Sequence, residues 1–450
     1  MPLIIGLVAA ALATVLVLLA ALARDGSPTA RPQPEPSVSP PAPARSAVPV
    51  LLAATGAPVP EPGTLARVLA RGVADPSFGG RLAGVVVGAH GPALFARAAG
   101  ALLPPASTAK LATAVAALSG LPPNARLTTR VVQRGTTVVL VGGGDPTLAS
   151  PAAARLNPRL ASLDRLAATT AGKLRAAGIG TVSLVYDAGE YVGPRTGTGW
   201  KPDYVSGGDV APVTALMVDG GRVRPDRRAR QPDPATAAAA MFGSRLAVHG
   251  VRVRGVPHSV PGSAGSGPEL ATVTSLPTGE LVDRMLTSSD NDLAEALGRA
   301  VAAQAGLPRS FAGAAEGIRR AVTALGVDVA RLRLLDASGL SPLDRATPGV
   351  LAAILVAAES RPVLRRIFPG LPVAGFTGTL RDRFRTGPAA AAAGLIRAKT
   401  GTLRDVSALA GIVVDRTGAV LAFAFLVPAA TSRSRAEAAL DRLAATLATL

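Results

Sequence analysis

The C-terminal end of the chain has the clearest pattern of apolar and polar positions. Short apolar runs at residues 395–402, 406–414 and 420–427 are separated by turn residues. This spacing predicts a three-stranded antiparallel meander. Apolar residues then return every three or four positions over 433–450, which predicts a helix packed by one face. Its apolar stripe consists of Ala436, Leu440, Leu443, Leu447 and Leu450.

Earlier segments alternate between helical and strand patterns. Residues 82–87 and 94–98 predict a hairpin, and 138–141 predicts a further strand. Helices are predicted at 106–118, 293–304, 314–325 and 349–358. Residues 150–270 mix both patterns with many Pro and Gly, which is typical of a separate insert. Helices before a late antiparallel meander indicate an α+β fold.

The N-terminal region predicts export from the cytoplasm. Residues 3–23 are an unbroken run of apolar or small residues, and as a helix they would span about 31 Å, enough to cross a bilayer. The domain prediction therefore gives residues 1–24 as a signal anchor or a signal peptide. The cleavage-like Ala21-Leu22-Ala23 favours a signal peptide, while the missing basic flank and the long run favour an anchor. Residues 25–49 are Pro-rich and predict a semi-rigid linker, with a recognition role as the alternative.

Composition excludes several kinds of chemistry. The 450 residues contain no cysteine, so thiolate catalysis, disulfides and cysteine-based metal sites are excluded, and the three histidines show no metal-ligand spacing. The net charge of +18 indicates a polyanionic partner or simply a solvated, arginine-rich surface. Nucleic acid is not expected as a partner, because aromatic residues for base stacking make up only 3% of the chain.

Lysine is scarce, and two of the four lysines fall in motifs that carry chemistry. Ser107 and Lys110 lie three residues apart at the start of a predicted helix, which places the hydroxyl and the amine on one face. A partly desolvated lysine can serve as the base that activates a serine nucleophile. Because a Ser-x-x-Lys spacing also arises by chance, the motif alone is only a hypothesis.

Two further motifs each have a structural alternative. Ser289, Asp290 and Asn291 precede a predicted helix, where such residues commonly act as N-caps. Residues 399–402, Lys-Thr-Gly-Thr, lie on the first strand of the meander and could be an edge strand protected by a charge. The functional interpretation is that Gly401 lets a ligand backbone approach, while Lys399 and Thr400 bind its carboxylate.

In combination the motifs are specific. The ordered set Ser-x-x-Lys, Ser-Asp-Asn and Lys-Thr-Gly is the pattern of penicillin-binding proteins and class A β-lactamases. Composition predicts only about 0.001 chance occurrences of all three. Over roughly residues 60–450 the chain resembles the D-alanyl-D-alanine carboxypeptidase/endopeptidase family, the class C low-molecular-mass penicillin-binding proteins. Further segments that carry the resemblance are 142–148, 199–200, 211–216, 336–341, 371–375 and 378–380.

The resemblance implies acyl transfer without a metal or an organic cofactor. Ser107 would attack the carbonyl between two D-alanines, and Lys110 would take its proton. Ser289, hydrogen-bonded to both Lys110 and Lys399, would relay a proton to the leaving amine. Asn291 would grip the substrate's peptide amide. The remaining implied roles are binding of the terminal carboxylate by Lys399, Thr400, Gly401 and Thr402, and an oxyanion hole formed by the N–H groups of Ser107 and Thr402.

The implied partners are peptidoglycan stem peptides as substrates and β-lactams as covalent inhibitors, with the membrane as a third if residues 3–23 stay uncleaved. The substrate bond would be D-Ala-D-Ala, with the D-Ala-diaminopimelate cross-link as a second one. The implied fold is an antiparallel sheet flanked by helices, the β-lactamase/transpeptidase-like domain, formed by 50–125 and 271–450. A mixed α/β domain at 126–270 would interrupt it. The insert is shorter than in family members with two nested extra domains, so one of these is expected to be reduced or absent around 218–250.

Two alternatives remain open at this stage. A β-lactamase would need a glutamate placed to activate water, and the sequence offers no clear candidate. A non-catalytic wall-binding homologue would need a broken motif, whereas all three motifs are intact.

Overall fold

The computed structural model describes residues 57–88, 92–260 and 266–450. The predicted apolar segment 3–23 and the Pro-rich linker 25–49 lie outside the described residues. Within the described ranges, no helix combines the length and the hydropathy that a membrane span requires.

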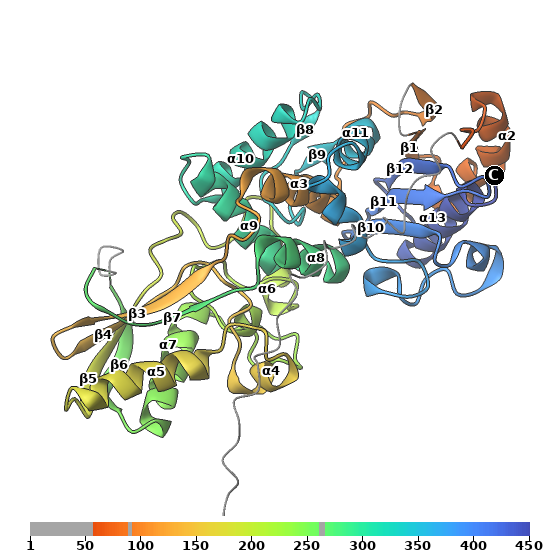
Figure 1. Ribbon diagram of the computed structural model, residues 1–450. Coiled ribbons are helices and arrows are strands. Elements are labelled where there is room, and N and C mark those ends of the chain that lie inside the picture. The colour runs from red at the N-terminus through yellow and green to blue at the C-terminus, as the bar shows by residue number, and fades with distance from the viewer. Residues whose placement is uncertain (1–56, 89–91, 261–265) are drawn as a thin grey trace, which may run out of the picture. The chain divides into compact units, whose positions relative to one another are not determined.

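The first sheet joins the two ends of the described chain. Its strands are β1 (Ala83–Val87), β2 (Ala93–Arg97), β10 (Ile396–Thr402), β11 (Ser407–Val414) and β12 (Val420–Val427). They are arranged in the order β10-β11-β12-β1-β2, with every neighbouring pair antiparallel. The predicted meander and hairpin are both confirmed, and the hairpin pairs onto the last strand of the meander. The strand that carries the Lys-Thr-Gly motif is therefore a sheet edge (Figure 1).

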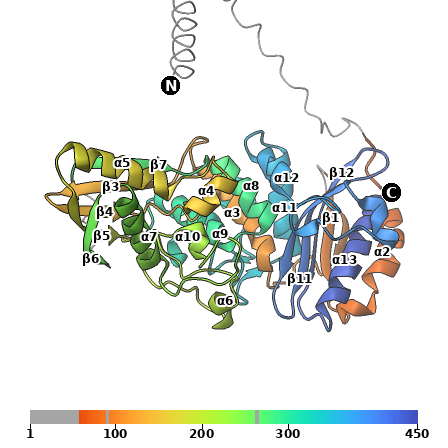
Figure 2. The ribbon, with the colours of Figure 1, turned by 90° about the horizontal axis from the view of Figure 1, so that it is seen from below.

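Side-chain size differs between the two faces of this sheet. Large residues such as Leu409, Phe423 and Phe425 pack in one core with α13 (Arg433–Leu447) and α2 (Pro62–Val73). Alternate positions such as Ala408, Ala410 and Ala424 belong to the other core, beside α11 (Pro348–Glu359). Because small side chains on that face keep the covering layer close, the helix that follows Ser107 packs into this second core (Figure 2).

Four further helices belong to the same core, whereas α11 is the helix that lies against strands β1, β11 and β12. The four are α3 (Lys110–Gly120), α8 (Thr278–Ser288), α9 (Asn291–Gln304) and α10 (Phe311–Ala324), and α3 packs against each of the other three. Residues 110–118 of α3 are all buried, as expected of a largely apolar helix. The predicted helical start at residue 106 differs in detail, because 106–109 form a tighter 3-10 turn. The shorter elements of this domain are η1 (Pro76–Phe78), η2 (Ala106–Ala109), β8 (Leu332–Arg333), β9 (Arg345–Ala346), η4 (Leu364–Arg366), α12 (Ile367–Gly370), η5 (Gly378–Leu380) and η6 (Gly387–Ala392).

A second sheet lies between α3 and α8 in the sequence. Its strands are β3 (Thr128–Arg134), β4 (Thr137–Val141), β5 (Thr181–Asp187), β6 (Arg252–Ser259) and β7 (Glu269–Thr274), in the order β6-β5-β4-β3-β7. The pairs β3–β4 and β3–β7 are antiparallel, whereas β4–β5 and β5–β6 are parallel. Helices α5 (Leu163–Ala176) and α7 (Pro234–Val248) pack in one core with it. The remaining elements are α4 (Pro151–Leu156), α6 (Asp203–Ser206) and η3 (Asp219–Gly221).

Together, the two sheets and their helices confirm the predicted fold class, α+β with a mixed α/β insert. The chain enters and leaves the insert at adjacent points, because the Leu127 N–H donates to Ser275 Oγ at 2.9 Å and the Ser275 N–H donates to Leu127 O at 2.8 Å. Since β7 runs past residue 270, we propose that the insert ends after Thr274.

Candidate active site

The turn that carries Ser107 is tightly held between two glycines. Ala106, just before Ser107, adopts the left-handed conformation with φ 48°, which is uncommon for a residue with a Cβ. A Cβ added at Gly339 would lie 2.0 Å from Ala106 O, and one added at Gly401 would lie 2.7 Å from Pro105 O. Both neighbouring segments therefore approach the backbone of the turn more closely than any other residue would allow. Gly401 thus has a packing role, and the approach of a ligand, which the sequence pattern suggests, stays a prediction.

Lys110 is fully buried, and its amine has three oxygen neighbours. Nζ lies 2.9 Å from Ser107 Oγ, 2.7 Å from Asn291 Oδ1 and 2.6 Å from Ser338 O. The amide orientation of Asn291 is fixed, because its Nδ2 donates to Asp209 O at 2.9 Å. The Asn291 and Ser338 oxygens can therefore only accept from the amine. A neutral amine would use its two hydrogens on them, which leaves its lone pair for the Ser107 hydroxyl.

The environment of Lys110 shifts its protonation equilibrium toward this neutral form. Burial lowers the pKa of Lys110 from 10.5 to about 8, while nearby carboxylates, Asp336 and Glu295 first, raise that pKa and limit the fall. An amine with a pKa near ambient pH is suited to taking a proton from a serine. The geometry and the charges around Lys110 thus agree on one chemical role, that of a base beside Ser107.

Ser289 lies at the point where one helix ends and the next begins. It ends α8 in a left-handed conformation with φ 57°, and its Oγ lies 2.9 Å from Lys399 Nζ. The expected second bond from Ser289 to Lys110 is not found among the contacts of the described residues. The left-handed backbone at Ser289 directs its hydroxyl to Lys399 instead. Lys399 donates in addition to Thr400 O at 2.9 Å.

Lys399 is also fully buried. Its pKa is held well below the ordinary value, first by burial and then by the like charges of Lys110 and Arg383. Two buried amines that influence each other are more stable when one is neutral, because a second positive charge in the same low-dielectric region is costly. The arrangement can therefore hold and exchange one proton between its polar groups.

The capping alternative for the Ser-Asp-Asn motif applies to only one of its residues. Asp290 is the N-cap of α9, with its carboxylate accepting from the Leu293 N–H at 2.9 Å. Ser289 and Asn291 instead contact the two buried lysines. The N-cap Asp290 therefore fixes the backbone on either side of it, from which the side chains of Ser289 and Asn291 extend.

The first turn of α9 is also tied to the insert. Asp292, next to Asn291, accepts from the Ala211 N–H at 2.8 Å and pairs with Arg230 at 3.0 Å, with both side chains almost completely buried. Burial raises the pKa of Asp292 to about 7, against the favourable charge of Arg230. The insert thereby supplies Asp209 O as the partner that orients Asn291.

The two threonines of the Lys-Thr-Gly-Thr motif have partners that the sequence did not suggest. Thr400 Oγ1 lies 2.8 Å from Thr379 Oγ1, and Thr402 Oγ1 donates to Glu437 Oε1 at 3.1 Å. Glu437 belongs to the C-terminal helix α13, far from the motif in sequence. A substrate carboxylate at Thr402 would therefore compete with Glu437 for that hydroxyl proton.

The structure brings the sequence-predicted residues Ser107, Lys110, Ser289, Asn291, Lys399 and Thr400–Thr402 into one region. Sequence reasoning missed the Ser338 carbonyl, Asp209, Thr379 and Glu437 as partners. Only Ser338 and Thr379 lay in segments that the family resemblance had singled out. Within the described ranges, no cluster of three or more His, Cys, Asp or Glu side chains could hold a metal ion.

Comparison with known proteins places the chain in a family. Residues 65–232 and 226–449 match the model of the D-Ala-D-Ala carboxypeptidase 3 (S13) family. The chain is 39% identical over 333 residues to a carboxypeptidase DacB of Mycolicibacterium smegmatis, covering 72% of this chain and 70% of that protein. It is 34% identical over 218 residues to a D-alanyl-D-alanine carboxypeptidase of Actinomadura sp., covering 47% of this chain and 38% of that protein.

Among solved structures, the fold is similar to that of penicillin binding protein 4 (dacB) from Haemophilus influenzae. The TM-score is 0.70 at 20% identity, covering 87% of this chain and 100% of that one. A second structure of that protein, complexed with a β-lactam, gives a TM-score of 0.64 at 20% identity, covering 85% of this chain and 99% of that one. At this identity the likeness concerns the fold.

Proposed function

Because the chain belongs to the D-Ala-D-Ala carboxypeptidase 3 (S13) family, it is a serine-type peptidase, and we propose that Ser107 is its nucleophile. The substrate is the D-Ala-D-Ala bond of peptidoglycan stem peptides, and β-lactams acylate the same serine. The observation that carries this proposal is the contact of 2.9 Å between Ser107 Oγ and the buried Lys110 amine. The other two neighbours of that amine are oxygens that can only accept from it.

Acylation begins with proton transfer from the Ser107 hydroxyl to neutral Lys110. The serine oxygen then forms a bond to the carbonyl carbon of the penultimate D-alanine, and the carbonyl oxygen takes up the negative charge. The backbone N–H groups of Ser107 and Thr402 stabilise this oxyanion, and one such donor contributes about 3 kcal/mol. The two glycine contacts support the step by fixing the turn on which Ser107 lies.

The leaving D-alanine nitrogen needs a proton before the C–N bond breaks. Ser289 gives its hydroxyl proton to that nitrogen and recovers one from Lys110, so the proton first taken from Ser107 reaches the leaving amine. In the structure Ser289 Oγ contacts Lys399, so the relay requires the hydroxyl to rotate toward Lys110. Water then attacks the acyl-enzyme, which releases the shortened peptide and restores Ser107.

Residues of β10 and of the start of α9 bind the substrate. Lys399 supplies positive potential for the terminal carboxylate, and Thr400 and Thr402 present hydroxyls beside it. Gly401 keeps this strand close to the nucleophile turn. Asn291 bonds the substrate's peptide amide with the amide hydrogen and the oxygen lone pair that Asp209 and Lys110 leave over. A pentapeptide with a free terminal carboxylate therefore fits the charge of the site.

The location of the enzyme follows from its substrate. Peptidoglycan lies outside the cytoplasm, so the peptidase acts there, and residues 3–23 serve as its membrane anchor or as its signal peptide. The positive net charge is consistent with work among anionic wall polymers.

The experiment is mass spectrometry of defined muropeptides after incubation with the full chain. We expect a pentapeptide to lose one D-alanine, with no loss when Ser107→Ala is used. A cross-linked dimer in the same assay reports endopeptidase activity separately. Intact pentapeptide after incubation with folded wild-type protein would contradict the proposal, and rapid hydrolysis of a β-lactam would favour a β-lactamase.

A further inference from the structure

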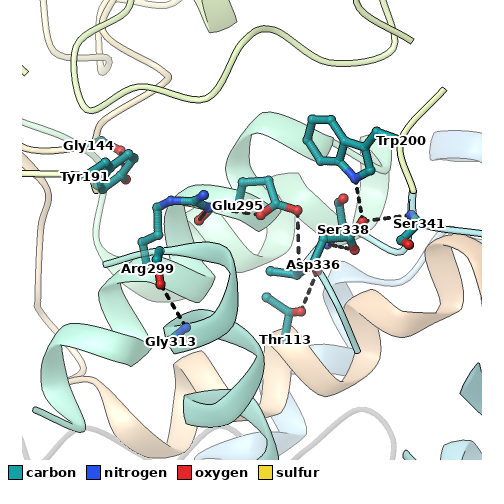
Figure 3. Close-up of polar contacts among 12 residues, drawn as sticks. Thr113, Gly144, Tyr191, Trp200, Glu295, Arg299, Gly313, Asp336, Ser338 and Ser341 are labelled. Carbon is teal, nitrogen blue, oxygen red and sulfur yellow. Dashed lines mark hydrogen bonds and ion pairs between the residues drawn. The ribbon is translucent and has the colours of Figure 1, made fainter. Parts of the chain in front are cut away.

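A buried ion pair lies behind the candidate catalytic lysine and has no part in the mechanism above. Glu295 and Arg299 are one turn apart on α9, with their side chains 1% exposed and the Arg299 Nη1 to Glu295 Oε2 distance 3.0 Å. The Arg299 guanidinium lies over the rings of Phe311, at 4.2 Å, and Tyr191, at 5.1 Å. Figure 3 shows the pair extended between Tyr191 and the loop that contains Asp336. Removing both charges of this ion pair from water costs free energy, so the burial of the pair requires a role that accounts for it.

The free oxygen of Glu295 contacts the backbone of that loop. Oε1 accepts from the Ala337 N–H at 3.1 Å. The neighbouring Asp336 carboxylate accepts from the loop's own N–H groups and from Trp200 Nε1, which closes the loop around it (Figure 3). The conformation of residues 336–341 is thus set by two buried carboxylates.

The carbonyl groups of the same loop face the helix that carries Lys110. Ala337 O accepts from Thr113 Oγ1 at 2.6 Å, and Ser338 O accepts from Lys110 Nζ at 2.6 Å. An unbroken path of contacts therefore runs from Glu295 through the Ala337 N–H and the Ser338 carbonyl to the amine. A displacement of the loop would move one of the two acceptors that aim the amine at Ser107.

We propose that Glu295 is a positioning residue for Lys110, acting through the loop at residues 336–339. This inference rests on the proposed function of Lys110 as the base. Glu295 holds the Ser338 carbonyl in place, and its charge favours the protonated amine. Burial raises the pKa of Glu295 to about 6 and the Arg299 charge limits that rise, so Glu295 is ionised above neutral pH and extends toward the loop rather than toward solvent.

The charge of Glu295 acts in concert with the other groups around the amine. Carboxylates that favour its protonated form are Asp336, Glu295, Asp290 and Asp292, in that order, whereas burial favours the neutral form. Lys399 is a nearby buried amine that interacts electrostatically with Lys110. Removal of one carboxylate charge should therefore make Lys110 lose its proton at lower pH.

The test uses two substitutions that separate the hydrogen bond from the charge. Glu295→Gln keeps an oxygen for the Ala337 N–H but removes the charge, whereas Glu295→Ala removes both. The matched control is Glu316→Gln, which removes a partly exposed carboxylate paired with Arg319 and Arg320 on α10. Each full-length variant is acylated with a fluorescent penicillin across the pH range, and rates are expressed per titratable active site.

We expect the acid limb of the acylation profile to move to lower pH by about half a unit in Glu295→Gln. The plateau rate should fall by about tenfold or more in Glu295→Ala, because the amine loses its alignment, and Gln should restore most of it. Glu316→Gln should match the wild type. A merely structural role would change the number of active sites and leave the pH limb in place.

Either an unmoved acid limb in Glu295→Gln or an undiminished plateau in Glu295→Ala would overturn the inference. If Glu295→Ala does not fold, because Arg299 is left unpaired, the pH limb of Glu295→Gln decides alone. Failure of the proposed function looks different, since wild-type protein would then form no Ser107-dependent adduct at any pH.

Discussion

A methyl group added at position 401 tests how the strand of Lys399 is held against the turn of Ser107. The new Cβ would lie 2.7 Å from Pro105 O, 3.1 Å from Ala408 Cβ and 3.2 Å from Ala106 Cβ. Ordinary contacts of this kind are 3.4 Å or longer, so either β10 or the turn must move by several tenths of an ångström. Because the atom met first belongs to the backbone, no side-chain rotation relieves the contact.

The expected cost has two parts. Overpacking in a closed core costs about 1–3 kcal/mol of unfolding free energy, so the thermal midpoint of Gly401→Ala should fall. A shift of about half an ångström between the nucleophile and the carboxylate-binding strand should slow acylation by about tenfold, given that a misplacement of about 1 Å can cost about 100-fold. The assay is the second-order rate of labelling by a fluorescent penicillin, with thermal unfolding of the same samples.

The control is Gly120→Ala at the far end of α3, where an added Cβ meets nothing within 4 Å. It should leave acylation unchanged and raise stability slightly, as expected for alanine in a helix. Wild-type stability of Gly401→Ala would refute the packing argument. If Gly401→Ala slows acylation without lowering stability, the result would instead support the sequence-based expectation that Gly401 lets a ligand backbone approach.

The other expectations concern charge and capping. Acylation should rise with pH through about 8 as Lys110 loses its proton, because that amine has a pKa of about 8 and burial destabilises its charged form. At pH 7.5 the neutral fraction of Lys110 is then about one quarter, whereas that of an unperturbed lysine is about one in a thousand. A pH–rate profile that rises only above pH 10 would contradict this expectation. Lys399→Ala should slow acylation far more than Arg404→Ala in the same labelling assay, because Lys399 is buried beside Ser289 whereas Arg404 is exposed. Equal effects of the two substitutions would mean that Lys399 acts only as a general surface charge. Asp290→Ala should lower the unfolding free energy by about 1 kcal/mol, because α9 loses its N-cap, whereas Asp290→Ser should keep most of the cap's contribution. Equal stability of the two variants in urea titration would argue against the cap.

Sequence pattern anticipated the first sheet better than the insert. Residues 420–427 alternate between two cores, so their strand was visible from apolar residues alone, and its bounds agree with β12. Within 150–270 the pattern is ambiguous, because six of the 15 residues of helix α7 are alanine and strand β6 is largely exposed. Periodicity cannot decide such segments, since neither presents one clear apolar face.

The site was predictable as a set of residues but not as a set of contacts. Motif spacing brought Ser107 and Lys110 onto one helix face, which is a local effect. The partner of Lys110 in the second motif turned out to be Asn291, because Ser289 adopts a left-handed conformation that directs its hydroxyl to Lys399. Backbone acceptors such as the Ser338 carbonyl leave no trace in residue identity, so only the folded structure reveals them.

The location of the penicilloyl adduct tests the central claim most directly. Trypsin releases residues 98–110, which contain Ser107 and Thr108 as their two hydroxyl side chains. Thr108 is buried and donates to Pro105 O at 2.6 Å, so it is not available as a nucleophile. After penicillin labelling, fragment-ion mass spectrometry should place the adduct on Ser107, and Ser107→Ala should carry none. An adduct on any other residue, or one that persists in folded Ser107→Ala, would contradict the account.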